Sequence, residues 1–305
     1  MKHVRNLLTQ TLIFLFLLLF TCGCEEPFSP KGPFEQQLVV YSVLDAKSDT
    51  QYVRLYLNYN PPGFDPNAVT TEQYDTAALV TISAGSRNFV FHDTLLGPTL
   101  HAFVDQAFRP QPGTAYALAI ASRFGSASAT TKIPAQGFMS VPDQSKLLFP
   151  NSFTDKNIDI NCTLGLNTKG FLVRFILVYS LENDTASVNT SEIPSSYRQD
   201  PTGQTTPVYP QLQRMFDPNP IISIPVTNYL QSIAQLTSEH GTRVILKQAK
   251  FYLIQADESA YNYYKIVNGF QDKYSIRTDQ PDYTNIQNGL GVFGSFNVDS
   301  LVIHF

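Results

Sequence analysis

The sequence predicts a mainly β protein, in which an immunoglobulin-like β-sandwich is followed by a second β-rich domain with one short helix. Apolar and polar residues alternate with a period of two in most segments after residue 37, which is typical of half-buried strands. Seven such segments fall within about 100 residues and are separated by turn residues, which is the spacing of a sandwich. We predict the sandwich at residues 37–136 and the second domain at residues 137–305.

The N-terminal segment has the pattern of a secretory signal. The basic residues Lys2 and Arg5 precede an unbroken apolar run, Leu12–Phe20. A membrane-spanning helix needs about 20 apolar residues, and this run has only half of that, so it resembles a cleaved signal rather than a retained anchor. We predict a signal peptide at residues 1–23 and an extended, proline-rich tether at residues 24–36.

Two closely spaced cysteines, Cys22 and Cys24, end the signal. A cysteine at the cleavage point resembles the lipobox of bacterial lipoproteins, in which the thiol is acylated and becomes the new N-terminus. Gly23 before Cys24 fits this pattern, whereas Thr21 stands where the lipobox usually has leucine. We predict lipidation at Cys24, with Cys22 as the alternative. An uncleaved signal anchor with ordinary thiols is the third reading.

The acidic pair Glu25 and Glu26 follows the predicted anchor directly. An acidic pair at this place resembles the export signal that sends some Gram-negative lipoproteins to the outer cell surface. The alternative is that both glutamates are solvated tether residues. The resemblance implies a protein of the bacterial outer membrane, lipid-anchored and facing the cell exterior.

The charge balance argues against nucleic acid as a partner. The whole chain has 21 basic and 25 acidic residues and a formal charge of −4. Losing Lys2 and Arg5 with the signal peptide changes this charge to −6. A nucleic-acid-binding domain would show a basic surface instead.

The predicted sandwich strands follow one another closely along the chain. They span residues 38–44, 52–57, 78–84, 87–92, 100–105, 116–122 and 126–133. Just before Tyr116, the pair Pro112 and Gly113 resembles the turn of fibronectin type III modules, in which the next tyrosine hydroxyl holds a corner of the fold. This local resemblance supports a fibronectin-like sandwich and implies no function by itself.

The second domain is predicted to contain strands at residues 158–167, 170–180, 244–246, 251–254 and 298–303. Cys162 alternates with polar neighbours in the first of these strands, so we expect it on the buried face. Asp257 caps the one predicted helix, which ends at Gly269 and packs its tyrosines on the sheet. The Pro-, Thr- and Gln-rich segment Ile193–Pro220 is predicted to be a long irregular loop.

The segment Gly289–Gly294 has the pattern G-x-G-x-x-G. A dinucleotide site needs this motif between a strand and a helix, with an acidic residue about 20 positions further on. Only eleven residues follow here, and their pattern is that of a strand. We therefore predict no cofactor, and we interpret the glycines as positions in a turn and a bulge after Asn288.

A family resemblance rests on four segments of the chain. Asp257–Tyr264 and Asn285–Gly294, with the opening Leu38–Val40 and Val53–Leu55, resemble an uncharacterised family of bacterial outer-membrane lipoproteins known only as a domain of unknown function. The resemblance covers nearly the whole chain after the signal peptide and implies no catalytic residues. Because such proteins are often encoded beside TonB-dependent transporters, it implies a transporter of this class as a partner.

The motif content does not indicate an enzyme. His92, His101, His240 and His304 stand apart in the sequence, and neither G-x-S-x-G nor H-E-x-x-H occurs. We predict that the protein is not an enzyme and needs no cofactor or metal; a triad assembled only by the fold is left open. Tryptophan is absent, but 16 tyrosines could stack on sugars, so a glycan or small-molecule ligand is also open.

Four Asp-Ser/Thr-apolar triplets resemble the acceptor motif of O-glycosylation in some Gram-negative bacteria. They begin at Asp75, Asp93, Asp184 and Asp299. Short motifs match by chance, and two of these triplets lie in or beside predicted strands. The other two place Thr76 and Thr185 in predicted loops, where we expect them to be accessible.

These observations predict a non-catalytic binding or accessory component of a TonB-dependent transport system, held at the outer membrane by its lipid. The longest irregular segments, Tyr59–Tyr74 and Ile193–Pro220, are the expected contacts with a partner. The alternatives are an adhesion or surface-structural lipoprotein, and a glycan-binding module.

Overall fold

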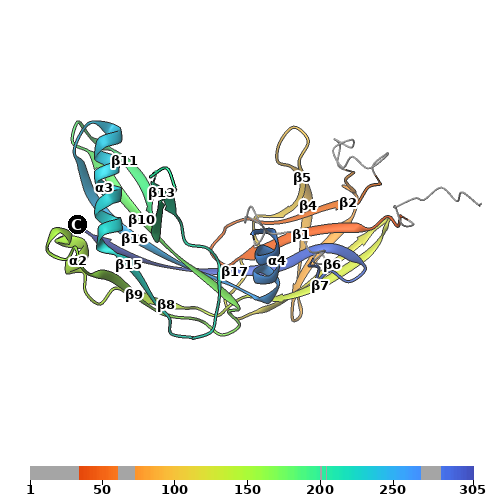
Figure 1. The fold of residues 1–305 in the computed structure, drawn as a ribbon. Coiled ribbons are helices and arrows are strands. Elements are labelled where there is room, and N and C mark those ends of the chain that lie inside the picture. Colours follow the sequence, from red (N-terminus) through yellow and green to blue (C-terminus); the bar gives the residue numbers. More distant parts are fainter. Residues whose placement is uncertain (1–33, 61–72, 200, 204, 269–282) are drawn as a thin grey trace, which may run out of the picture. The chain divides into compact units, whose positions relative to one another are not determined.

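One large mixed β-sheet organises the chain (Figure 1). The computed structural model describes residues 34–60, 73–199, 201–203, 205–268 and 283–305, and residues 36–305 form one unit. The signal peptide, the lipobox and most of the tether lie outside the described residues, as do most of Tyr59–Tyr74. The protein is mainly β with few helices.

The seven strands predicted for the N-terminal region are confirmed, and the fourth runs further than expected, to Leu95. These strands are β1 (Leu38–Asp45), β2 (Gln51–Leu57), β3 (Leu79–Ala84), β4 (Arg87–Leu95), β5 (His101–Asp105), β6 (Ala115–Ser122) and β7 (Gly125–Lys132). In β2, β6 and β7, buried residues alternate with exposed or half-buried ones, because successive side chains of a strand point to opposite faces.

The rest of the chain adds further strands and three α-helices to the described structure. In order these are β8 (Phe138–Ser140), α2 (Ser145–Leu148), the 3-10 helix η2 (Pro150–Ser152), β9 (Asn157–Thr163), β10 (Gly170–Leu181), β11 (Asp184–Ile193), β12 (Ser196–Gln199), β13 (Thr205–Val208), β14 (Gln213–Arg214), β15 (Ile221–Pro225), α3 (Val226–His240), β16 (Val244–Ala256), α4 (Glu258–Asn268) and β17 (Gly289–His304).

The last strand joins the two ends of the described chain within the sheet. The strand order is β11-β10-β16-β17-β1-β2-β5-β4-β3-β6-β7, and β14 pairs with β10 at the side. β17 runs parallel to β1, in register from Leu38 opposite Gly289 to Asp45 opposite Phe296, and antiparallel to β16. Such a parallel neighbour needs a long connection, and here almost the whole chain provides it.

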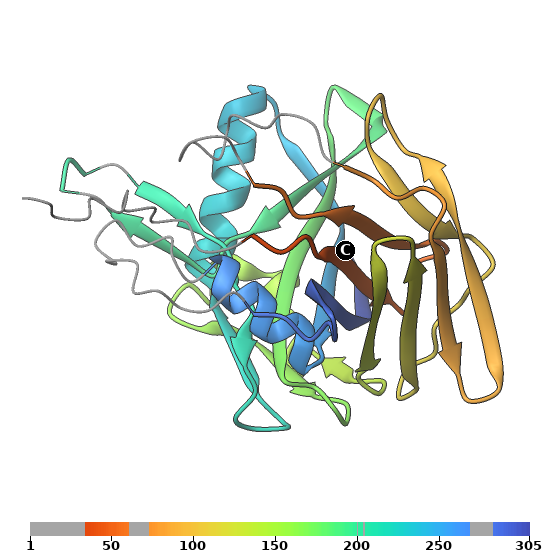
Figure 2. The ribbon, with the colours of Figure 1, turned by 90° about the vertical axis from the view of Figure 1, so that its right-hand side faces the viewer.

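The N-terminal strands curl until β7 returns to the segment before β17 (Figure 2). The backbone N–H of Ser128 donates to the carbonyl of Gln287 at 3.2 Å, and the N–H of Gln287 donates back at 2.8 Å. The curled strands enclose a core that includes Phe108, Leu118 and Phe293. The predicted tyrosine corner is present, because the Tyr116 hydroxyl accepts a hydrogen bond from the backbone N–H five residues upstream at 2.8 Å.

A second core lies between β10, β16 and helix α3 (Figure 1). Tyr229 of α3 is fully buried, and its ring centroid is 5.7 Å from that of Phe175 on β10. The prediction of a single short helix was wrong, because α3 was not expected. Its Thr, Ser and Asn residues have weak helix propensity, yet its apolar positions recur at helical spacing, and Gly241 ends it with a left-handed φ of 62°.

The prediction of an irregular loop at Ile193–Pro220 was also wrong in part. Ser196–Gln199 and Thr205–Val208 form a two-stranded antiparallel hairpin, β12–β13, and β14 pairs with β10. Thr205, Thr206 and Val208 of β13 are β-branched and favour extended structure, as does the aromatic Tyr197 of β12. In contrast, the strand predicted through residue 167 ends at Thr163, so that Leu166 is 80% exposed in a turn.

The glycines of Gly289–Gly294 lie within β17 itself and not in a turn and a bulge. Asn288 does form the expected turn, with φ at 56°. Strand β17 begins at the next residue. A Cβ on Gly291 would stand 2.0 Å from the Val40 carbonyl, and a Cβ on Gly294 would stand 2.8 Å from the backbone of Ala260 in α4. These glycines allow β1 and α4 to approach β17 closely.

The predicted border between residues 136 and 137 stays a prediction. The described residues form two large, separate cores, one under each half of the sheet. However, Phe293 belongs to the first core and Ile303 to the second, so β17 contributes to both. The sheet itself continues from one half to the other.

Candidate functional site: an apolar groove beside helix α4

The predicted anchor and export residues, Cys22, Cys24, Glu25 and Glu26, lie outside the described residues. Among the predicted glycosylation acceptors, Thr76 is exposed in a turn before β3. Thr185 is exposed as well, but it lies in strand β11 and not in a loop. The structure therefore gives both hydroxyl groups access to solvent, in two different local conformations.

The histidines lie on separate elements, and each of three has one polar neighbour. The Nδ1 atom of His101 lies 3.1 Å from the carboxylate of Asp93 at an exposed position. The Nε2 atom of His240 lies 3.2 Å from the Tyr179 hydroxyl, and His304 contacts the Gln248 amide at 3.4 Å. Among the described residues, no cluster of three or more His, Cys, Asp or Glu side chains could hold a metal ion.

Cys162 lies on the buried face of β9, as predicted, and is 3% exposed. Burial raises the pKa of its thiol to about 11, because desolvation disfavours the thiolate. A thiol in this state is a poor nucleophile. Cys162 is therefore a packing residue of the second core.

A continuous strip of aromatic rings crosses the outer face of the sheet. Tyr56 on β2 stacks on Tyr41 of β1 with centroids 6.0 Å apart, and Tyr41 contacts Tyr263 of α4 at 5.6 Å. Tyr263 then contacts Tyr264 at 5.7 Å, and Tyr264 contacts Phe296 of β17 at 5.5 Å. The tyrosines of α4 thus pack on the sheet, as the sequence analysis predicted.

The end of this strip borders an apolar groove, which is the candidate site. Its floor is a cross-strand row: Leu172 on β10 faces Ile254 on β16, which faces Val298 on β17. These three side chains are half-buried, whereas Phe171, Val173 and Leu253, which flank the row on β10 and β16, belong to the second core. The row forms because residues opposite each other in paired strands lie on the same face.

Two walls rise from this floor. Tyr264 of α4 and Phe296 form one wall, and the segment Pro210–Leu212 forms the other. Leu212 packs, as does Phe296, against a small cluster of Ala256, Ala260 and Tyr261, so this wall is attached to the sheet. The groove encloses about 520 Å³, which is within the range of ligand-binding clefts.

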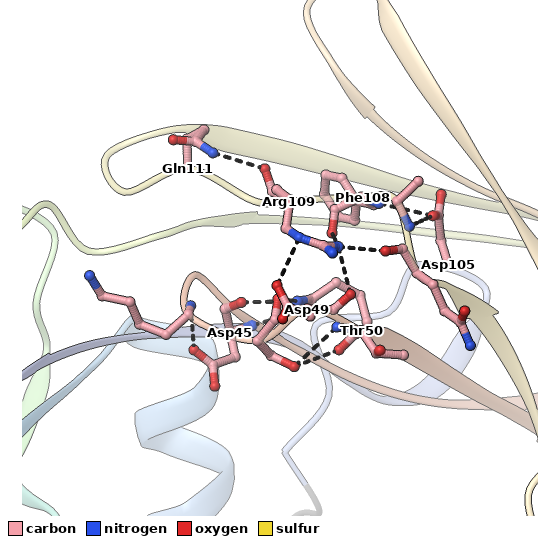
Figure 3. Close-up of polar contacts among 12 residues, drawn as sticks. Asp45, Asp49, Thr50, Asp105, Phe108, Arg109 and Gln111 are labelled. Carbon is pink, nitrogen blue, oxygen red and sulfur yellow. Dashed lines mark hydrogen bonds and ion pairs between the residues drawn. The ribbon is translucent and has the colours of Figure 1, made fainter.

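Asp45 stands at the end of the groove and is the only charged residue among the described residues that line it. Hydrogen bonds to its backbone and side chain hold Asp45 in place (Figure 3). The carboxylate accepts a hydrogen bond from the backbone N–H of Lys47 at 2.8 Å, and the Gln51 amide both accepts from the Asp45 N–H at 3.0 Å and donates to the Asp45 carbonyl at 2.9 Å. Arg109 holds the same turn from β5–β6, since its Nη1 atom donates to the Asp49 carbonyl at 2.6 Å.

A buried polar cluster positions α4 and therefore one wall of the groove. One carboxylate oxygen of Asp257 accepts from the backbone N–H groups of Ala260 at 2.8 Å and Ser295 at 3.0 Å. The other accepts from the Thr131 hydroxyl of β7 at 2.6 Å. Burial raises the pKa of Asp257, although these donors act against the shift. The predicted cap thus joins α4 to β17 and β7 at once.

The groove was not predicted from the sequence. Part of the signal was present, because the strand predicted at residues 170–180 is apolar on both faces. A strand in a sheet with one solvated face would alternate instead. What the pattern lacks is the identity of its neighbours: Leu172, Ile254 and Val298 are far apart in the sequence and meet only through strand pairing.

The described part of the chain contains no helix that is both long and apolar enough to cross a bilayer. No curated protein matches the sequence. Solved structures give distant matches to immunoglobulin-like and fibronectin-like proteins. One is the crystal structure of chicken CNTN1 FN1-FN3 domains, at 9% identity and a TM-score of 0.20, covering 72% of this chain and 59% of that chain.

A second solved structure that resembles this chain is a titin fragment, A168169, at 9% identity and a TM-score of 0.18, covering 74% of this chain and 91% of that chain. The chain covers 59% of the CNTN1 fragment, which is less than two thirds of the length of that fragment. The match to a sequence family is much more extensive, because it takes in residues 25–301. The protein belongs to the family described as Domain of unknown function (DUF4249).

Proposed function

We propose that this protein is a surface-exposed outer-membrane lipoprotein that binds a partner in the groove beside α4 and catalyses no reaction. The observation that carries the binding role is an apolar groove, open on one face of the sheet, with a floor of three aliphatic side chains. Apolar clefts with a few polar groups are the usual places of ligand binding. The curled N-terminal strands, which we interpret as a fibronectin-like sandwich, support the first wall through β1 and β17.

The location rests on the lipobox resemblance at Cys24 and on Glu25 and Glu26 after it. If Cys24 is acylated, Cys24→Ala should abolish palmitate labelling and release the protein from membranes, or leave its precursor uncleaved. Cys22→Ala is the matched control and should change neither. Retained labelling of Cys24→Ala would instead assign the lipid to Cys22.

Export to the cell surface has its own test. Changing both Glu25 and Glu26 to Ala should leave the protein acylated but protected from protease added to intact cells. Gln is the matched substitution, because it keeps the size of both side chains and removes only the charge. Unchanged digestion of both variants would show that the two glutamates are ordinary tether residues.

The proposed partner is a TonB-dependent transporter in the same membrane. Confinement to one membrane raises the effective concentration of both proteins, so even a weak contact is occupied. The segment Ile193–Pro220, predicted as a contact, supplies the groove wall Pro210–Leu212, which supports its role.

Site-specific photocrosslinking in intact cells tests this partner. A photoreactive residue at Gln211, which is exposed on the groove rim, should crosslink to the transporter. The control position is Val188, which is 68% exposed on β11 and does not line the groove. Equal crosslinking from both positions, or crosslinking only to a second copy or to extracellular matrix, would contradict the accessory role and favour adhesion.

A further inference from the structure

The geometry points to an extended polypeptide segment as the occupant of the groove, with bulky apolar side chains beside a basic residue. This inference rests on the proposed function, because it names the chemistry of the ligand for the same groove. It starts from the lining: Leu172, Ile254 and Val298 present only aliphatic surface, and Tyr264 and Phe296 add aromatic surface.

This lining favours apolar side chains over a glycan. Sugar hydroxyl groups that lose water need hydrogen-bond partners in the protein, since an unpaired buried hydroxyl costs about 1–3 kcal/mol. The floor has none to offer, because its three residues are Leu172, Ile254 and Val298. Polar groups are confined to the rim, at Asp45, Gln211 and the Tyr264 hydroxyl.

The charge at the end of the groove selects a basic neighbour. Asp45 contributes the one carboxylate of the described lining. The nearest row of the same face contains Arg174 and Tyr252, but the Arg174 guanidinium is already paired with Glu192, its Nε atom at 3.0 Å from the carboxylate. A lysine or arginine of the ligand would therefore meet an acidic group at Asp45.

The shape of the floor selects an extended chain. The row from Leu172 to Val298 crosses three neighbouring strands, and neighbouring strands lie about 4.8 Å apart. Side chains on one face of an extended peptide recur at about 6.6 Å, twice the rise per residue of a strand. Two alternate side chains of such a peptide fit along this row, and the wall Pro210–Leu212 runs beside them.

The test is a selection from a random twelve-residue peptide library displayed on phage. The bait is the full lipid-anchored protein in phosphatidylcholine nanodiscs, and empty nanodiscs first remove phage that bind lipid. Wild-type protein should enrich peptides that carry two bulky apolar residues at alternate positions next to Lys or Arg. Replacing this basic residue by Glu in an enriched peptide should weaken binding by about tenfold, as expected for a charge-assisted contact.

Three variants and one control separate the inference from the proposed function. Asp45→Asn should keep the apolar preference and lose the basic one. Val298→Asp should lose both, and Val298→Thr, which is nearly isosteric and keeps the strand, should weaken binding in the same direction. Val188→Asp, at an exposed position on β11, is the control and should enrich the same peptides as wild type.

Each outcome has a defined meaning. Apolar peptides without a basic residue, or with an acidic one, would overturn the charge selection while leaving groove binding intact. Enrichment of glycine- and serine-rich or purely polar peptides would overturn the inference altogether. If wild type and both Val298 variants enrich the same peptides, or if none are enriched, the groove is not a peptide site and the inference fails, whereas the proposed function is decided separately by photocrosslinking from Gln211 against Val188.

Discussion

Gly291→Ala tests whether the close approach of β17 to β1 holds the two ends of the described chain together. Gly291 has a φ of 107°, and a Cβ built on it would lie 2.0 Å from the Val40 carbonyl oxygen. Carbon and oxygen atoms in adjacent strands normally approach to about 3.3 Å, so the strands would have to separate by more than about 1 Å. Backbone hydrogen bonds beyond about 3.2 Å are weak, so the parallel pairing would be lost locally.

The magnitude follows from comparison with Gly85. This glycine also has a positive φ, at 60°, but nothing lies within 4 Å of a Cβ built on it. Gly85→Ala therefore measures only the cost of placing a side chain at a positive φ, which is about 1–2 kcal/mol. Gly291→Ala adds the clash and the broken ladder, so we expect a loss of more than about 4 kcal/mol, which is exceptional for a single substitution.

The assay is equilibrium urea unfolding of both variants beside wild type. Gly85→Ala should unfold at a slightly lower urea concentration, whereas Gly291→Ala should be unfolded or nearly unfolded without urea. If the two variants lose the same free energy of unfolding, β17 does not approach β1 as closely as described, and the interpretation of the β17 glycines as spacers is refuted.

Three further predictions concern single interactions. Tyr116→Phe removes the hydroxyl that accepts from the Gln111 N–H. It should lower the free energy of urea unfolding by about 1–3 kcal/mol, because the N–H group loses its partner. The control Tyr52→Phe, at a 45% exposed position, should leave this free energy unchanged. Burial raises the pKa of Asp257 above its ordinary value, so the stability that this residue contributes is full below about pH 4 and is lost as pH rises through the folded-state pKa. Over this pH range, the free energy of unfolding of wild type should therefore fall more steeply than that of Asp257→Asn. Parallel curves for the two proteins would contradict the raised pKa. Cys162, with its pKa raised to about 11, should react with iodoacetamide only after unfolding in urea, and rapid labelling of the folded protein would show that the second core is open.

Local chemistry alone predicted a large part of this molecule. The seven N-terminal strands follow from alternating side chains, because a strand with one buried face needs an apolar residue at every second position. Helix α4 follows from the cap at Asp257, whose carboxylate does accept the Ala260 N–H, and the buried place of Cys162 follows from its alternation with polar neighbours. The signal pattern before Cys24 also comes from the sequence alone, and it stays a prediction because it lies outside the described residues.

The tertiary structure decided which of these elements are neighbours. Alternation states which face of a strand is buried, but it does not state which strand lies beside it, because any apolar face can cover another. The parallel pairing of β1 with β17 and the row of Leu172, Ile254 and Val298 depend on the burial of the whole sheet and on contacts between residues that are far apart in the sequence. Helix α3 was missed for the same reason: its propensity is weak, and its stability comes from Tyr229 packed in the second core. The groove exists only as a product of this pairing, so no local pattern could have located it.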